Sequence, residues 1–437
     1  MTALAHVPHL PTKPLVGHTL DFLRDPYGLH QRSRAQLGAV YKVNLLGAWR
    51  VTLGGADALE FILGDTSGLF SSYNGWDMLH GLFPGGLMLR DGADHRTHRR
   101  IMQTAFRKPA LDAYRVSMEA ALEQLLHAWP LNQPFAFFPA IKRLTLQMGA
   151  QVFMGLPLDD PRSAPLNAAF AAEVAASIAP IRRPLPGTAM RRGLNARRYL
   201  IETFAAMIPE RKANPGPDFF SQMCVAEDED GRGWTPEEIT DHFNFLMMAA
   251  HDTTASSLTK VAWALATYPE WQEAVRAEVD ALGAGRLDDA ALARLEVTDR
   301  VFREALRLLP PLAFIPRRAT RAFDWQGHSF PAGTQVSALP GLVQIDPAHW
   351  TAPDRFDPDR FAPGRHEDRS HKYAWAPFGG GAHKCIGLHF ATLQVKLFTA
   401  LLMRRSRLSL ASDRPVTWAR VPIAQPKGGL PVVLHGR

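Results

Sequence analysis

The chain has few cysteines, since Cys224 and Cys385 are the only two among its 437 residues. A disulfide framework is therefore excluded, and the composition is typical of a protein in a reducing compartment. Runs of roughly 18 apolar residues, which a transmembrane helix requires, are missing too. The start of the chain carries Pro8, Pro11 and Pro14 where a secretory signal would be apolar. We therefore expect a cytoplasmic protein without a membrane anchor.

Repeats, low-complexity segments and flexible linkers are also absent from the sequence. The 46% hydrophobic and 21% charged residues are ordinary for a globular chain and exclude a disordered or fibrous one. The formal net charge of +7 is spread over the whole length and does not by itself indicate a nucleic-acid partner. We expect a single domain over residues 1–437 and a monomer.

Hydrophobic periodicity predicts mostly helices with a minor sheet. Alternating Val, Leu and Tyr predict a hairpin at 40–53, and the Gly-rich stretch 64–94 predicts a long loop. Helices are expected at 56–63, 195–212, 269–282, 301–309 and 387–406. The stretch between 95 and 153 is also expected to be helical, with breaks at Pro130, Pro134 and Pro139. A small sheet is expected at 313–344.

One expected helix is unusually long. Thr235 is suited to an N-cap, Pro236 to the first turn, and Glu237 and Glu238 to the positive end of the helix dipole. The apolar pattern then continues to about Tyr268, roughly 50 Å at 1.5 Å per residue. A helix of that length must cross the whole domain.

The most informative segment reads Phe378-Gly-Gly-Gly-Ala-His-Lys-Cys385-Ile-Gly387. It places a thiol in a Gly-rich loop just before a helix, where backbone N–H groups and nearby positive charge stabilise a thiolate. The glycines allow a flat group to approach the backbone closely. Taken alone, the cysteine fits an inert buried residue beside a turn better than a reactive thiol, because a free cysteine is commonly an inert core residue.

The complete string resembles the haem-binding loop of the cytochrome P450 family. That resemblance implies a mainly α fold with small β-sheets, a single triangular helical domain with a long central helix, and haem b (iron protoporphyrin IX) as cofactor. It makes Cys385 the axial ligand of the haem iron, with Phe378 shielding the sulfur and Gly381 and Gly387 permitting the turn. Phe378, Gly379 and Gly387 are expected among the residues that bind the haem. His383 stands where the family usually has Arg and would bond a haem propionate.

Glu304-Ala-Leu-Arg307 pairs opposite charges three residues apart on a helix, which by itself indicates no more than a surface ion pair. The family has Glu-x-x-Arg at this distance before the cysteine loop, together with an Arg in a Pro-x-Arg-Phe string, matched here by Arg360. The resemblance implies a buried structural network of Glu304, Arg307 and Arg360.

Ala249-Ala-His-Asp252-Thr253-Thr interrupts the apolar pattern of the long helix with residues that compete for backbone bonds. Locally it could be a helix start at Asp252, but the apolar pattern continues on both sides. By the resemblance, Thr253 bonds dioxygen, Asp252 relays protons and Ala249 lies against the haem. Ala250 stands where the family usually has Gly, which narrows the dioxygen groove.

His95 and Arg99 lie four residues apart and share a helix face, which alone would fit a solvated basic face with Arg96, His98 and Arg100. By the resemblance, both hold a haem propionate. Arg317 matches a further propionate contact of the family, although its neighbour Arg318 could take that place instead.

The resemblance implies a haem-thiolate monooxygenase, an oxidoreductase that hydroxylates a hydrophobic substrate. Dioxygen and two electrons are consumed, and the electrons come from a separate donor such as ferredoxin with its reductase, because no flavin or iron–sulfur motif is present. Arg99, Arg100, Arg107, Lys108 and Lys384 would attract an acidic donor. The alternatives are a haem-thiolate peroxygenase or isomerase, against which the Asp252–Thr253 pair argues, and a non-catalytic haem-binding sensor.

The substrate is expected to be large and apolar: a terpenoid, sterol, retinoid or fatty-acid-like molecule. Pro184-Leu-Pro-Gly-Thr188 followed by a basic helix is similar to the family branch that oxidises such isoprenoids. The expected pocket residues are mostly aromatic or aliphatic: Trp76, Leu79, Leu82, Phe83, Phe170, Phe245, Met248, Ala249 and Phe314.

Overall fold

The computed structural model describes residues 4–437, which cluster into two compact units. The first unit contains the residues up to Asp77, Arg300–Cys385 and Pro415–Lys427, and the second contains Met78–Asp299, Ile386–Arg414 and Gly428–Arg437. Each unit is therefore assembled from segments far apart in the sequence. The prediction of a single domain over 1–437 stays a prediction.

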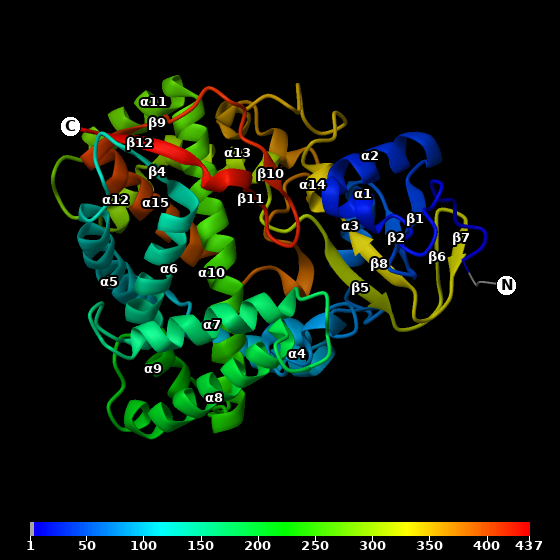
Figure 1. Ribbon diagram of the computed structural model, residues 1–437, viewed down its shortest axis with the longest axis horizontal. Helices are drawn as coiled ribbons and strands as arrows, with labels where there is room; N and C mark the ends of the chain where they lie inside the picture. The colour runs from blue at the N-terminus through cyan, green and yellow to red at the C-terminus, as the bar shows by residue number, and fades with distance from the viewer. Residues whose placement is uncertain (1–3) are drawn as a thin grey trace. The chain divides into compact units, whose positions relative to one another are not determined.

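The first unit is built around a five-stranded sheet in the order β1-β2-β8-β5-β3. The hairpin β1–β2 is antiparallel, β8 pairs parallel with β2, and β5 is antiparallel to β8 and β3 (Figure 1). The strands of this sheet are β1 (Val40–Leu45), β2 (Ala48–Leu53), β3 (Phe70–Ser71), β5 (Ile315–Ala319) and β8 (Gln335–Ala338). Two antiparallel two-stranded ribbons belong to the same unit. One pairs β6 (Phe323–Trp325) with β7 (His328–Phe330), and the other pairs β10 (Trp418–Ala419) with β11 (Gln425–Pro426).

The helices of the first unit are short. A buried apolar cluster joins the sheet to helix α3 and continues to Tyr373 and Ala376, just before the predicted cysteine loop. The unit contains α1 (Thr19–Arg24), α2 (Pro26–Leu37), α3 (Ala56–Leu63), α14 (Pro340–Val343) and, from Arg300 onward, α13 (Glu296–Leu308).

The second unit is a helical bundle around α10 (Pro236–Thr267), against which α6, α8 and α15 pack (Figure 1). A three-stranded antiparallel sheet, β4-β12-β9, completes it. Its elements are α4 (Gly92–Thr104), α5 (Lys108–His127), α6 (Phe137–Met154), α7 (Ser163–Ser177), α8 (Ala189–Ala213), α9 (Phe219–Cys224), α11 (Pro269–Asp280), α12 (Asp289–Ala293), α15 (Leu388–Arg405), β4 (Pro134–Ala136), β9 (Ser406–Leu410) and β12 (Pro431–Gly436).

The long helix begins and ends where the sequence predicts. Thr235 and Glu238 form a capping box, in which each side chain accepts a hydrogen bond from the backbone N–H of the other residue. The helix ends at Thr267, directly before Tyr268 and Pro269, because the residue preceding a proline is disfavoured in the α conformation. The 32 residues of α10 agree with the expected length.

Two boundary predictions were wrong. Pro139 does not break a helix but lies in the first turn of α6, where a proline N–H would have no partner anyway. The actual interruption between α4 and α5 falls at residues 105–107, which contain no proline. In addition, α8 begins at Ala189, earlier than expected, because Thr188 caps it through the N–H of Arg191.

One helical stretch, Gly381–Arg405, is long and apolar enough to cross a membrane by composition. Half of its most apolar window is buried inside the molecule, as in a core helix of a globular protein. It is therefore weak evidence for a membrane span.

Candidate functional site

The Gly-rich segment before Cys385 forms a tightly turned loop at the end of a first-unit segment. The N–H of Cys385 donates to the carbonyl of Phe378 at 2.9 Å, which closes the loop. Gly379 and Gly381 have φ of 68° and 62°, in the left-handed region. A Cβ on Gly381 would lie 1.8 Å from the carbonyl oxygen of Leu63, so this position accepts glycine alone.

The two cysteines have opposite environments. Cys385 is exposed, whereas Cys224 on α9 is buried. Burial raises the pKa of the Cys224 thiol to about 11, which disfavours its thiolate. Because the thiolate is the form that ligates iron, Cys385 fits the axial position of a haem and Cys224 does not.

The ring of Phe378 is fixed by two aromatic neighbours. Its centroid lies 5.9 Å from that of Trp375 and 6.5 Å from that of Phe302. Both contacts are at tilted or edge-on angles, which aromatic pairs prefer. The predicted loop residue Phe378 is thus held in place, seven residues before the thiol. Gly387, by contrast, has an ordinary φ of −84°, so its backbone does not require glycine.

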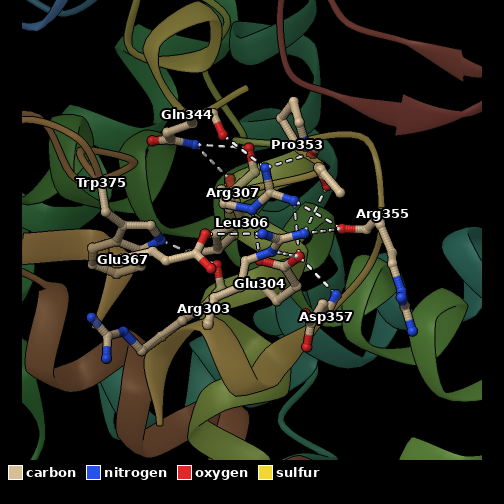
Figure 2. Close-up of polar contacts among 12 residues, drawn as sticks. Arg303, Glu304, Leu306, Arg307, Gln344, Pro353, Arg355, Asp357, Glu367 and Trp375 are labelled. Carbon is tan, nitrogen blue, oxygen red and sulfur yellow. Dashed lines mark hydrogen bonds and ion pairs between the residues drawn. The ribbon is translucent and has the colours of Figure 1, made fainter. Parts of the chain in front are cut away.

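Glu304 and Arg307 form a fully buried ion pair on α13 (Figure 2). Nε and Nη2 of Arg307 donate to the two carboxylate oxygens of Glu304 at 2.7 and 2.8 Å, a bidentate arrangement. The remaining guanidinium protons are donated to the carbonyls of Gln344, Pro353 and Arg355. The pair is therefore buried with its hydrogen-bonding capacity used, unlike a surface salt bridge.

Arg360 joins this pair as the resemblance implies. Its Nε donates to Oε1 of Glu304 at 3.2 Å, and the N–H of Asp357 donates to the same oxygen at 2.9 Å. Arg360 also forms an ion pair with Glu367 at 3.0 Å and donates to the carbonyls of Thr351, Ala352 and Arg355. The three charged side chains together fix the backbone between residues 344 and 367.

Two residues connect this network to the cysteine loop, and sequence reasoning missed both (Figure 2). Nε2 of Gln344 donates to the carbonyls of Leu306 and Arg307, while its Oε1 accepts the N–H of Ala376 at 3.1 Å. Nε1 of Trp375 donates to the carbonyl of Arg303 at 3.1 Å. Helix α13 thereby holds the chain two residues before Phe378. No spacing in the sequence signals these contacts.

Arg317 and Arg318, neighbours in β5, differ in their exposure to solvent and in their partners. Arg317 is buried, and its Nη1 donates to the carbonyl of Pro316 at 2.9 Å. Arg318 lies more openly and forms an ion pair with Asp77 at 3.0 Å. The negative partner of Arg318 is thus supplied by the protein itself. His383, in the 3₁₀ turn Gly381–His383, is half-buried.

In the second unit, α4 carries His95, which is buried, and Arg99, which is half-buried. His98 is also buried, contrary to its place in a solvated basic face. Its Nδ1 lies 2.7 Å from Nε2 of His242 on α10, and its Nε2 lies 3.0 Å from Nη1 of Arg90. Burial lowers the pKa of His98, and lowers that of His242 well below its usual range. Neutral histidines therefore join α4 to α10.

Asp252 and Thr253 lie within unbroken α10, so no helix starts at Asp252. Thr253 donates to the carbonyl of Ala249 at 2.7 Å, which satisfies its hydroxyl within the helix. Asp252 forms an ion pair with Lys142 of α6 at 3.0 Å. Burial lowers the pKa of His251 to about 4, so this neighbour of Asp252 is neutral at pH 7.

The predicted pocket residues are mostly buried. Phe83 packs edge-on against Phe245 of α10, with ring centroids 6.5 Å apart. Phe170 of α7 meets the ring of His251 at 5.8 Å. The ring centroids of Phe314 and Phe22 of α1 lie 5.5 Å apart, so one side of the Phe314 ring packs in the core of the first unit. Trp76, Leu79 and Leu82 are buried, whereas Met248 and Ala249 are partly exposed.

The structure therefore assembles the predicted residues in two sets. Those in the first unit are Trp76, Glu304, Arg307, Phe314, Arg317, Arg360, Phe378, Gly379, His383 and Cys385. Those in the second are Leu79, Leu82, Phe83, His95, Arg99, Phe170, Phe245, Met248, Ala249, Asp252, Thr253 and Gly387.

Comparison with known proteins agrees with this arrangement. The family model of cytochrome P450 matches residues 8–426. Cytochrome P450 136 of Mycobacterium tuberculosis is 37% identical over 97% of this chain and 87% of its own length. Human cytochrome P450 26C1 is 29% identical over 97% and 87%. The solved structure named "Retinoic acid bound cyanobacterial CYP120A1" superposes with a TM-score of 0.87 at 28% identity, covering 99% of this chain and all of that one.

Glu304→Ala should destabilise the protein severely. The substitution leaves Arg307 and Arg360 buried without their carboxylate, which typically costs about 3–5 kcal/mol. Urea unfolding would measure the loss in the free energy of unfolding, and poor recovery of folded protein would accompany it.

The matched control is Asp359→Ala, which removes an exposed carboxylate that forms an ion pair with Arg300 in the same unit. Exposed pairs contribute about 0–1 kcal/mol, so this variant should unfold almost as the parent does. Equal stability of the two variants would contradict a structural role for Glu304.

Proposed function

The chain belongs to the cytochrome P450 family, and on that premise we propose that it hydroxylates a large apolar substrate of isoprenoid or fatty-acid type. The observation that carries the proposal is the exposed thiol of Cys385 in a loop whose glycines, closing hydrogen bond and Phe378 ring are all fixed. The haem, when bound, supplies the dioxygen chemistry, and a thiolate ligand favours O–O cleavage.

The residues proposed to hold the haem are those that can supply a thiolate or cations. Cys385 would ligate the iron, and His95, Arg99, His383 and Arg317 would meet the propionates. The choice of Arg317 over Arg318 is supported by its burial and by the ion pair that already engages Arg318 with Asp77. Phe378, Gly379, Gly387 and Ala249 would line the haem.

Asp252 and Thr253 are proposed to move protons. The carboxylate of Asp252 is held by Lys142, whose ammonium is partly exposed and can exchange protons with solvent. The hydroxyl of Thr253 donates to the carbonyl of Ala249 in its own helix, and a rotation of this side chain would turn the hydroxyl toward a ligand. Such a pair distinguishes a monooxygenase from a peroxygenase or isomerase, which needs no proton delivery, and from a haem sensor, which needs no turnover.

The proposed substrate class is supported by two observations. The lining residues predicted in the second unit are apolar, and Phe83, Phe170 and Phe245 supply aromatic surface. A structural relative is named with retinoic acid bound. Binding of such ligands scales with buried apolar area, about 25 cal/mol per Å².

The proposed partner is a ferredoxin-like electron donor acting on a monomer in the cytoplasm. Neither cysteine forms a disulfide, which is compatible with a reducing compartment. Part of the predicted basic surface is neutralised, because Arg100 pairs with Asp228 and Lys108 with Asp112 and Asp289. Attraction of an acidic donor would therefore depend mainly on the exposed Arg107 and Lys384.

Cys385→Ser should abolish the absorption band that marks thiolate ligation in the reduced carbon-monoxide complex. Serine offers no thiolate to the iron, whereas Cys224→Ser removes a buried thiol whose raised pKa keeps it protonated. Difference spectra of both variants test this directly. Loss of the band in Cys224→Ser and its survival in Cys385→Ser would refute the assignment.

Thr253→Ala should leave haem and substrate binding intact while more reductant is lost as peroxide. Proton transfer by a positioned side chain contributes about 10²–10⁴-fold, although water can replace part of it here. Product and peroxide formed per reductant consumed would be measured, with Ser257→Ala, one turn further along α10, as control. Parental coupling in Thr253→Ala would remove Thr253 from the relay.

A panel of terpenoids, sterols, retinoids and fatty acids should produce substrate-induced shifts in the haem spectrum, followed by hydroxylation in the presence of reductant and dioxygen. Sugars and amino acids bury too little apolar area to do so. Spectral shifts and turnover confined to small polar compounds would contradict the proposed class. Binding without turnover by any donor would favour the sensor.

A further inference from the structure

A carboxyl group lies fully buried where α7 meets α10. Glu173 of α7 has no surface in contact with solvent, and Asn244 of α10 is buried beside it. Nδ2 of Asn244 donates to Oε1 of Glu173 at 2.9 Å. The second oxygen of Glu173, Oε2, and the Oδ1 of Asn244 have no hydrogen-bond partner among residues 4–437. Buried polar atoms are almost always hydrogen-bonded, so two unpartnered oxygens at one place indicate a ligand group that completes them.

The carboxyl group of Glu173 is predominantly neutral at pH 7. Burial raises its pKa to about 8, and the hydrogen bond from Asn244 and the charge of Arg197 offset this rise only in part. Arg197 of α8 is engaged elsewhere, because it forms an ion pair with Asp241 at 2.6 Å. A neutral acid carries an O–H group, so the two unpartnered oxygens amount to one donor, on Glu173, and one acceptor, on Asn244.

A buried acid at this place lowers the stability of the protein at neutral pH. The pKa of Glu173 is about 8 in the folded chain against an ordinary value of 4.5, so folding takes up a proton between these values. The contribution of Glu173 to stability is therefore greatest below pH 4.5 and is lost as the pH rises toward 8. Groups with such strongly shifted pKa values are concentrated at functional sites.

The pair lies one turn from the proposed substrate site on both helices. On α10, Asn244 and Met248 are four residues apart and share a helix face, and Met248 is partly exposed. On α7, Glu173 lies three residues after Phe170, whose ring meets that of His251. The side chains proposed to line the substrate site on α7 and α10 therefore end at a polar pair.

Neighbouring segments pack tightly around this end of the site. A Cβ on Gly193 of α8 would lie 2.2 Å from Cβ of Ala176 on α7, and a Cβ on Gly86 would lie 2.2 Å from the ring of Phe245 on α10. Such close contacts help to keep the polar pair away from water. A hydrogen bond in a dry site discriminates strongly, because a ligand without the matching group leaves the protein atoms unpaired.

We propose that Glu173 and Asn244 bind a neutral hydroxyl group of the substrate, which is therefore an apolar alcohol. The oxygen of the alcohol accepts the proton of Glu173, and its own O–H donates to Oδ1 of Asn244. A carboxylate does not fit, because it offers Asn244 no donor and brings an uncompensated charge into a buried site. This inference rests on the proposed function, which it narrows from apolar molecules in general to those that carry a hydroxyl group.

The position of the pair also predicts which end of the substrate reacts. Asn244 and Asp252 are eight residues apart, about 12 Å along α10 at 1.5 Å per residue. Asp252 is one of the residues proposed for proton transfer. The oxidised carbon should therefore lie far from the hydroxyl group that Glu173 and Asn244 hold.

The test compares farnesol, farnesoic acid and farnesene, which share a chain and differ in carrying a hydroxyl group, a carboxylate or no oxygen. Their binding to the full-length holoprotein is measured by the shift in the haem spectrum. We expect farnesol to bind about tenfold more tightly than the other two, which is the effect of about one hydrogen bond. The product should carry its new oxygen at the end remote from the hydroxyl group. Equal affinities for farnesol and farnesene, or oxidation at the carbon that bears the hydroxyl group, would overturn the inference.

Glu173→Leu should weaken the binding of farnesol about tenfold and leave that of farnesene unchanged, because only farnesol loses a hydrogen bond. Glu173→Gln keeps a donor and an acceptor and should retain the preference for farnesol. Glu202→Leu removes an exposed carboxylate of α8 and is the matched control, expected to bind all three ligands as the parent does. The same loss of farnesol affinity in Glu202→Leu and Glu173→Leu would count against a specific role of Glu173.

The pH dependence of binding separates a proton donor from a residue that only packs. The affinity of the parent for farnesol should fall as the pH rises through about 8, because the carboxylate of Glu173 has no proton to donate. Glu173→Gln should show no such fall, although Arg197 and Asp241, the charged groups that face Glu173 from α8 and α10, are present in both proteins. A parental pH profile in Glu173→Gln would refute the assignment, and this comparison decides even if Glu173→Leu cannot be recovered folded.

The outcomes also distinguish this inference from the proposed function on which it rests. Spectral shifts of equal affinity with all three ligands would contradict the hydroxyl site alone and leave an apolar substrate in place. The lack of a spectral shift with any of them would contradict both the hydroxyl site and the proposed substrate class.

Discussion

The first unit depends on one buried carboxylate. Glu304 lies with two guanidinium groups in a region that water does not reach. Buried charges are tolerated only when each is paired and its remaining hydrogen bonds are made. Arg307 and Arg360 make their remaining hydrogen bonds to backbone carbonyls between residues 344 and 355. These bonds fix the conformation of a stretch that has little regular secondary structure. The same demand places Gln344 where it can hold the N–H of Ala376. A charge network on α13 thereby determines where the cysteine loop begins.

The cysteine loop shows how a backbone constraint becomes chemistry. Gly381 approaches the carbonyl of Leu63 too closely for any side chain, so the loop turns tightly and leaves the thiol of Cys385 exposed. The aromatic contacts of Phe378 with Trp375 and Phe302 fix the other end of the loop. The chain contains one more thiol, but burial keeps Cys224 protonated, so the two cysteines cannot exchange roles. Iron ligation in a P450 needs an accessible cysteine sulfur, and Cys385 is the cysteine proposed for that role.

In the second unit, several polar residues within the long apolar helix α10 each have a hydrogen-bond or ion-pair partner. Asp252 is tolerated because Lys142 of α6 pairs with it, and Thr253 because its hydroxyl bonds to the carbonyl one turn before. Near the start of the same helix, His242 and His98 form a hydrogen bond between α10 and α4, and burial lowers the pKa of both, which favours their neutral forms. For Asp252 and His242 a residue from another helix makes the placement possible, whereas Thr253 is satisfied within α10. Asp252, one of the two residues proposed for proton transfer, is therefore supported by a contact outside its own helix.

The sequence alone determined the features that depend on residues close together in the chain. The capping box at Thr235 and Pro269 set the bounds of α10, alternation and a Gly47 turn set the hairpin, and the glycines around Cys385 identified the loop. It could not determine features that need two distant segments. These include the parallel pairing of β8 with β2 and the hydrogen bonds by which Gln344 and Trp375 link α13 to the cysteine loop. They also include the burial of His98, the ion pair of Lys142 with Asp252, and the burial of Arg317 next to an Arg318 that pairs with Asp77. Local propensity acts over a few residues, whereas a buried polar group takes whichever partner the folded chain brings within about 3 Å.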